Sequence, residues 1–397
     1  MSFNALLLLV FLQFGRPQDF FPFLKPFRLA LLLSFIALAL SLVSKSDTIS
    51  WEIFSVTEGK RYFLFFLIMI VGVPFAYHRG YAFNYVLFKY LANVIFFVLF
   101  FVNVGSISQL KTVLFIVCVS VLFQASMSLA QGSFLYGRFY PGTMFDPNDL
   151  AFFLVSFLPL FFLFIRKSQL LIKRMLAVAG FFLSLGVILL TGSRGGLLGL
   201  ITVILFVLFT KTLIEKLSIK ILLGLFIAFA VFFNSDRINI DRLHSVTDLS
   251  SDYNVSSETG RLSVWGRGLS LAISNPISGV GVTCFNRAIG GHRADDGEIP
   301  RWQSPHNSYV QVVTEVGVIG FFIFMSLIIV CLLNFHRLSK VKFSVDGLPD
   351  YYAGIPAVCK VGLTGALVGA FFLTQAYSSI FTFYFAMSAI LRRLSGE

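Results

Sequence analysis

Long apolar runs recur along the whole chain, separated by short stretches of charged and turn-forming residues. A membrane-spanning helix needs roughly 20 mainly apolar residues, and about twelve runs approach that length. They lie near residues 3–14, 28–45, 62–78, 83–103, 110–130, 149–165, 174–191, 196–210, 218–233, 308–334, 355–375 and 377–392. The first run is too short to cross a bilayer alone, and the last two are separated only by a polar patch, residues 375–379. The pattern predicts an all-α polytopic membrane protein with about twelve transmembrane helices.

One long polar segment, residues 234–307, interrupts this series and divides the chain into three parts. Residues 1–233 hold about nine predicted spans, and residues 308–397 hold about three with a short basic tail. Within the long segment, an apolar stripe at Leu262, Trp265, Leu269 and Ile273 has helical spacing. It predicts a short amphipathic helix that lies along the membrane surface.

The basic residues of the short loops orient the spans, because loops rich in Lys and Arg stay in the cytoplasm. Four such clusters are 166–174, 211–220, 337–342 and 392–393. Counting spans places all four on one face, which we take as cytoplasmic together with both termini. The segment 234–307 is then extracytoplasmic.

Composition agrees with a membrane environment and excludes several classes of site. Charged residues make up 13% of the chain, against about 25% in soluble domains. The net charge of +12 collects in short loops, so no nucleic-acid partner is expected. The four cysteines suggest no disulfide framework, and no metal-ligand spacing is present. We therefore expect neither a metal nor another cofactor.

The charges of the long loop are unusual in kind. Residues 234–307 contain seven arginines and eight acidic residues but not one lysine. Arginine suits the planar, bidentate recognition of phosphate or carboxylate. The alternative is that translocated loops simply avoid lysine, and the composition alone leaves both explanations open.

A histidine stands where this loop re-enters the membrane, in the sequence Pro305-His306-Asn307-Ser308-Tyr309. A neutral imidazole there can accept a proton as a general base, although a histidine that only caps a helix or lies in the interface also fits. Asn307 or Ser308 is expected to cap the following helix. Glu315 lies about two turns further in, where a charge costs about 2.5–3.5 kcal/mol, so we expect it to be paired or functional.

Three arginines stand at other loop–helix boundaries on the same face. Ser193 and Arg194 belong to a glycine-rich turn followed directly by a helix, an arrangement that favours anion binding. Arg261 opens the predicted amphipathic helix after Gly260, and Arg138 lies in the loop Gly137–Thr143, ahead of Asp146-Pro147-Asn148-Asp149. Each is also explained by a tight turn or an interfacial arginine.

Taken together and in this order, these stretches resemble the O-antigen ligase and polymerase superfamily of bacterial envelope glycosyltransferases. The resemblance covers most of the chain. It implies a GT-C-like, metal-independent inverting transferase of the inner membrane with a periplasmic active face. The implied donor is a glycan on undecaprenyl diphosphate. His306 would activate the acceptor hydroxyl, Arg194 and Arg261 would hold the diphosphate, and Arg138 would be a further contact. Ser193, Asn307 and Glu315 would support them.

Several functions remain open from the sequence. The acceptor could be a lipid A–core sugar for a ligase, a growing chain for a polymerase, or a protein hydroxyl; with no soluble domain visible, we favour the first two. A secondary transporter with about twelve spans is the alternative from another class, but such transporters show internal repeats, which are not visible here. A flippase for lipid-linked oligosaccharides would need a continuous polar path through the bilayer, which is also not visible.

Overall fold

The computed structural model is helical almost throughout. It describes residues 2–44, 51–135, 137–142, 145–165, 169–210, 224, 257, 260–295, 297–340 and 349–396. Its one sheet within these residues is a hairpin of β1 (Ser133–Leu135) and β2 (Arg138–Tyr140), paired antiparallel with Phe134 opposite Phe139. The all-α class predicted from the apolar runs is confirmed.

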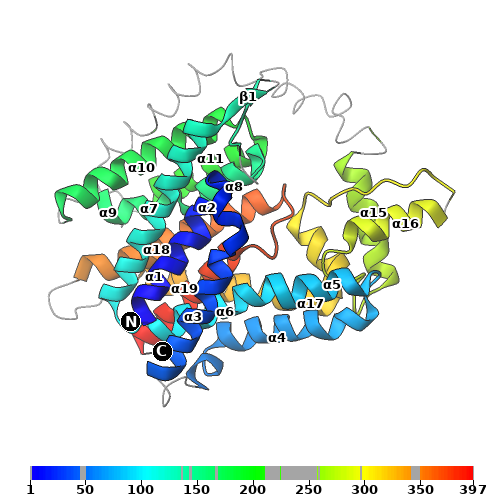
Figure 1. Ribbon diagram of the computed structural model, residues 1–397, viewed down its shortest axis with the longest axis horizontal. Coiled ribbons are helices and arrows are strands. Elements are labelled where there is room, and N and C mark those ends of the chain that lie inside the picture. Colours follow the sequence, from blue (N-terminus) through cyan, green and yellow to red (C-terminus); the bar gives the residue numbers. More distant parts are fainter. Residues whose placement is uncertain are drawn as a thin grey trace.

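The helices of the described residues follow one another along the chain as Figure 1 labels them. They are α1 (Ser2–Gly15), α2 (Pro17–Phe20), α3 (Leu29–Ser44), α4 (Thr57–Gly72), α5 (Arg79–Tyr85), α6 (Leu91–Asn103), α7 (Ile107–Gln131), α8 (Pro147–Phe157), α9 (Phe162–Ile165), α10 (Leu171–Leu190), α11 (Arg194–Phe209), α15 (Arg261–Ser274), α16 (Phe285–Asp295), α17 (Ser308–Leu338), α18 (Pro349–Ala370) and α19 (Ser379–Ser395). A π-helical turn, Val86–Tyr90, joins α5 to α6.

Six of the described helical segments are long and apolar enough to cross a membrane. They are Pro22–Ser41, Arg79–Asn103, Ile107–Gln131, Pro147–Ile165, Leu171–Leu190 and Ser308–Leu338, and three shorter apolar helices are Ser2–Gly15, Arg194–Phe209 and Gly354–Ala370. The chain is therefore a polytopic membrane protein. The predicted span 218–233, apart from residue 224, most of the loop 234–259 and the basic loops 166–168, 211–220 and 341–342 lie outside the described residues, so the count of twelve stays a prediction.

Two predicted boundaries differ from the structure for local reasons. The apolar run 62–78 ends its α-helix at Gly72, because Pro74 has no N–H to continue it and lies in a 3-10 turn. The last apolar stretch divides as predicted, but α18 already ends at Ala370, so that residues 371–378 form the whole connection to α19.

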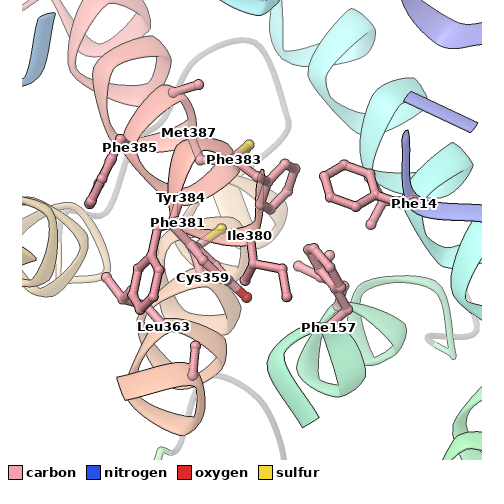
Figure 2. Close-up of a cluster of buried hydrophobic side chains, with 14 of the residues drawn as sticks. Phe14, Phe157, Cys359, Leu363, Ile380, Phe381, Phe383, Tyr384, Phe385 and Met387 are labelled. Carbon is pink, nitrogen blue, oxygen red and sulfur yellow. The ribbon is translucent and has the colours of Figure 1, made fainter. Parts of the chain in front are cut away.

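Aromatic side chains hold the centre of the bundle together. The rings of Phe14 in α1, Phe157 in α8 and Phe383 in α19 meet in pairs at centroid distances of 5.0, 5.7 and 5.3 Å, all edge-on, as Figure 2 shows. Such edge-to-face contacts are the favoured geometry for aromatic pairs. They join the end of α1 to the start of α19, so these two helices run antiparallel and the chain termini lie at the same end of the bundle (Figure 1).

A break in α17 anchors the module of α15 and α16 beside the bundle (Figure 1). Gly317 has φ 76° and ψ 177°, which interrupts the helix and frees backbone groups there. The segment before α16 fills the gap: Val280 N–H donates to Thr314 O at 2.8 Å, and Val318 N–H donates to Pro276 O at 2.8 Å. These bonds satisfy backbone groups that would otherwise be costly inside a membrane.

Candidate functional site

Several helix ends meet at the end of the bundle opposite the termini, around the connection Phe371–Ser378. Helices α8, α11, α17 and α19 begin there, and α18 ends there. Ser308 at the start of α17 donates from Oγ to Leu373 O at 2.7 Å. A side chain on Gly195, at the start of α11, would meet Phe372 at 3.0 Å, so this turn also packs directly against the connection. The candidate residues predicted on separate loops thus share one neighbourhood.

His306 lies at the junction between the long loop and α17. Its backbone has φ 44°, in the left-handed region that few non-glycine residues adopt. Its N–H donates to Thr374 Oγ1 at 3.0 Å, and the preceding carbonyl, Pro305 O, accepts from Trp265 Nε1 at 2.7 Å. A strained backbone that is fixed from both sides is typical of functional positions.

The surroundings of His306 favour its neutral form. Part of the imidazole remains accessible to solvent. Partial desolvation, and next the positive charge of Arg261, lower the pKa of His306, while the carboxylate of Asp146 acts in the opposite direction. The pKa therefore lies below its ordinary value of 6.5, and the imidazole is available as a proton acceptor at neutral pH.

Asn307 rather than Ser308 caps α17. Its Oδ1 accepts from the N–H groups of Tyr309 at 2.9 Å and Val310 at 3.1 Å. The hydroxyl of Ser308 instead links α17 to the connection, where it also accepts from Gln375 N–H at 2.9 Å. The cap and this link fix the start of the helix that follows His306.

The turn before α11 has the geometry predicted for Ser193 and Arg194. Ser193 is the N-cap, and its Oγ accepts from Gly196 N–H at 3.1 Å. Arg194 is the first residue of the helix and is half-buried. A guanidinium at a helix N-terminus adds its charge to the positive end of the helix dipole, which favours an anion.

Arg138, in β2, is hydrogen-bonded to the same turn. Its Nε donates to Thr191 O at 3.0 Å and its Nη2 donates to Asn148 Oδ1 at 2.9 Å. The next helix, α8, is capped by Asp146, whose Oδ1 accepts from Asn148 N–H at 2.7 Å. Arg138 thus joins the β-hairpin, the turn before α11 and the start of α8; Thr143 of its motif lies outside the described residues.

Arg261 occupies the first position of α15, close enough to His306 to shift its pKa. The helix packs through Val264, Gly268, Leu271 and Ala272, which are buried. Leu262, Leu269 and Ile273 of the predicted stripe are 50%, 47% and 80% exposed. An apolar stripe left open on a helix beside the bundle agrees with its predicted position at the membrane surface.

This arrangement of arginines and a histidine on loop–helix boundaries can now be compared with known proteins. Residues 179–325 match the O-antigen ligase family model. The match confirms the predicted resemblance over these residues and supports a glycosyltransferase of the O-antigen ligase or polymerase type. No curated protein matches the chain.

The segment that matches the O-antigen ligase model contains the turn of Ser193 and Arg194, then Arg261, His306, Asn307 and Glu315. Arg138 and the connection 371–378 lie outside it but contact its residues. The neighbourhood around His306 is therefore assembled from the family segment and from two flanking parts of the chain.

Glu315 in the ligase-type segment serves the attachment of the loop. It is buried, and its Oε1 accepts from Phe285 N–H at 3.3 Å while its Oε2 accepts from Gln311 Nε2 at 3.4 Å. Its backbone carbonyl accepts from Gly281 N–H at 3.0 Å. Among the described residues, these partners come from the loop backbone and α17 rather than from an arginine. The carboxyl thus holds the loop against α17.

Sequence reasoning missed the contribution of the connection between α18 and α19. Thr374 accepts the N–H of His306, and Gln375 Nε2 donates to Asp149 Oδ1 at 2.8 Å. The available signal is the polar patch 375–379 inside an apolar stretch, which by itself indicates only a division between two spans. A loop between two spans explains polar residues at this position equally well. The sequence alone therefore does not predict that this connection contacts His306.

Within the described residues, no group of three or more His, Cys, Asp or Glu side chains could hold a metal ion. All four cysteines are buried and none forms a disulfide. The polar groups that the structure brings together are arginines, one histidine, the carboxylates of Asp146 and Asp149, and hydrogen-bonding side chains. Their chemistry is that of proton transfer and of binding to an anion.

Proposed function

We propose that the protein transfers a glycan from undecaprenyl diphosphate to an acceptor hydroxyl by an inverting, metal-independent mechanism. The acceptor is a lipid A–core sugar or a growing glycan chain, and the reaction takes place on the periplasmic face of the inner membrane. The observation that carries this proposal is the position of His306. It is fixed in a left-handed conformation, kept neutral, and set beside Arg261 at a cluster of helix ends.

In the proposed step, a nitrogen of the His306 imidazole takes the proton of the acceptor hydroxyl. The oxygen attacks the anomeric carbon of the donor sugar, and the bond from that carbon to the phosphate oxygen breaks on the opposite face. The electron pair leaves with the lipid diphosphate. The products are the glycosylated acceptor with inverted configuration, undecaprenyl diphosphate and a protonated histidine that returns its proton to water.

Arg194 and Arg261 stabilise the leaving diphosphate. Each is the first residue of a helix, so its guanidinium is added to a positive helix end. Preorganised cations aimed at developing negative charge stabilise the transition state, and they replace the metal used by many glycosyltransferases. Arg138 contributes by holding the turn that carries Arg194, since it donates to Thr191 O within that turn.

The location of the site suits a lipid-linked donor. Arg194 and Arg261 lie at helix N-termini on the end of the bundle where the connection 371–378 lies, and an isoprenoid diphosphate presents its headgroup at such a boundary. The exposed stripe of α15 would face the lipid surface next to it.

The test is transfer by the purified protein in lipid nanodiscs, supplied with an undecaprenyl-diphosphate glycan and either lipid A–core or a preformed glycan as acceptor. Product with the first acceptor identifies a ligase, and chain extension with the second identifies a polymerase. If neither acceptor is glycosylated, while the same protein in proteoliposomes moves a solute or the lipid-linked glycan across the bilayer, the transferase proposal is wrong.

A further inference from the structure

A small cavity lies directly behind the connection that holds His306. Its volume is about 190 Å³, well below the range of cavities that take drug-sized ligands. The walls come from α1, α8 and α19 and from the adjoining loops. The lining residues with polar side chains are Gln13, Arg16, Asp149, Gln375, Ser378 and Ser379.

The polar groups of the cavity are held in place and mostly engaged. Asp149 Oδ1 accepts from Gln375 Nε2 at 2.8 Å, and Arg16 Nε forms an ion pair with Asp19 Oδ2 at 2.7 Å. Both acidic groups offset the guanidinium, so the cavity does not present the excess positive charge that a diphosphate requires. Its chemistry suits an uncharged ligand with several hydroxyl groups.

One polar group of the lining lacks a hydrogen-bond partner. Ser378 is the N-cap residue of α19, but its side chain makes no capping bond. Its Oγ is buried and has no partner among the described residues. Buried hydroxyls in native structures are nearly always paired, and a rotation of the Ser378 side chain towards the cavity would give this hydroxyl a ligand group or a water as partner.

The remaining walls are apolar, formed by four phenylalanines and by Ile380. Phe14, Phe145, Phe152 and Phe153 line the cavity, and the guanidinium of Arg16 lies 4.8 Å from the ring centroid of Phe145. A pyranose ring has an apolar C–H face and a rim of hydroxyl groups. Aromatic walls with a carboxylate, an amide and a hydroxyl at their edge match both surfaces of such a ring.

The cavity and His306 share one short segment of backbone. Thr374 binds the N–H of His306, and the next residue, Gln375, lines the cavity while its own N–H donates to Ser308 Oγ. A sugar ring in the cavity would therefore be separated from His306 by one layer of residues, the connection itself.

We propose that this cavity is a subsite for one monosaccharide unit of the glycan substrate, recognised by Asp149, Gln375 and Ser378. The inference rests on the proposed transferase function, whose donor and acceptor both carry sugars. The subsite selects one sugar of the glycan, in contrast to the arginines, which bind the diphosphate whatever glycan it carries.

Binding is measured without any lipid-linked substrate, so that its outcome does not depend on catalysis. Wild-type protein in nanodiscs free of sugar detergents is titrated with a panel of neutral and N-acetylated hexoses, 6-deoxyhexoses and pentoses, and contact is read by saturation-transfer NMR. At least one monosaccharide should bind. Gln375→Leu and Ser378→Ala should each weaken it by about tenfold, since each removes a polar partner.

Two matched variants make the result specific. Gln109→Leu makes the same change at the start of α7, at the other end of the bundle, and should bind as the wild type does. His306→Ala should also bind, because the cavity does not include His306. Thermal unfolding checks that the variants fold, and Ser378→Ala leaves the Asp149–Gln375 pair intact. Absence of binding by the whole panel, or equal binding by both cavity variants and the wild type, would overturn the proposal.

Transfer kinetics then distinguish the two sources of the sugar. If the subsite holds an acceptor unit, Ser378→Ala raises KM for the acceptor and leaves KM for the donor unchanged; if it holds a donor unit, the reverse is seen. An unchanged KM for both substrates contradicts the subsite. If the protein shows monosaccharide binding but never transfers glycan, the transferase function fails while the binding site stands.

Discussion

At the scale of single residues, the charges around His306 set the pH range over which it can act as a base. Because desolvation and Arg261 lower its pKa, the imidazole stays neutral below pH 6.5, and activity should be lost only as the pH falls through this lowered value. Arg261→Gln removes a nearby positive charge, so the acid limb of kcat/KM should move to higher pH. Asp146→Asn keeps a side chain able to cap α8 but removes the negative charge, so the limb should move to lower pH.

The measurement is the pH dependence of kcat/KM for the wild type and both variants. Arg261→Gln also weakens diphosphate binding, so its rate falls at every pH, and the position of the acid limb is the quantity compared. Identical limbs in all three proteins would show that His306 is not the titrating group.

A variant of Arg194 tests whether diphosphate binding at the start of α11 needs the shape of the guanidinium or only its positive charge. Arg194→Lys keeps the positive charge but loses the planar fork that binds two phosphate oxygens. Activity should fall about 100-fold, the usual effect of removing one preorganised group that stabilises developing charge. Arg301→Lys, at an exposed position of the long loop 234–307, is the matched control and should be as active as the wild type. Full activity of Arg194→Lys would argue against a diphosphate clamp.

Thr374 is expected to position His306 without touching the substrate. Thr374→Val removes the acceptor of the His306 N–H and should lower kcat about fivefold, because a lost hydrogen bond destabilises the strained backbone by roughly 1 kcal/mol. Thr374→Ser retains a hydroxyl and should restore the rate, and the acid limb should be unchanged in both. A shifted acid limb, or no rescue by serine, would contradict a positioning role.

At the scale of secondary-structure elements, the break in α17 fixes the loop module to the bundle. Gly317 has φ 76°, and a Cβ there would lie 2.4 Å from Ile277 O. Gly317→Ala should therefore destabilise the protein by more than the roughly 1–2 kcal/mol that a left-handed residue costs, and thermal unfolding should show a lower midpoint. Gly266→Ala in α15 has open space around it and should unfold at or above the wild-type temperature. Equal midpoints for the two variants would contradict a close backbone crossing.

Helix ends illustrate which part of these elements the sequence can predict. The cap of α17 by Asn307, one of the two residues expected there, follows from a side chain that acts within one turn, whereas α18 ends at Ala370, before the predicted boundary. The break at Gly317 was not predicted, because a glycine in an apolar run is common. Only the distant segment 276–281, which pairs with the broken turn, shows why a glycine is needed there.

At the scale of the whole molecule, span counting correctly grouped the candidate residues at one end of the bundle. Counting spans, with the long loop 234–307 taken as one extracytoplasmic connection, places the starts of α8, α11 and α17 on one face. The sequence alone does not predict which residues are neighbours within that end. The pairing of Gln375 with Asp149 joins residues 226 positions apart, and it depends on packing that no local pattern encodes.

The central claim is that His306 is the base of a glycosyl transfer, and one comparison tests it most directly. Glycan transfer from undecaprenyl diphosphate is measured for wild type, His306→Ala and His292→Ala in nanodiscs, with correct folding checked by thermal unfolding. His292 is an exposed histidine on α16 of the same loop module and serves as the matched control. If His306 is the base, His306→Ala loses transfer by about 100-fold or more, while His292→Ala retains it. Transfer by His306→Ala at the wild-type rate would show that His306 is not the base.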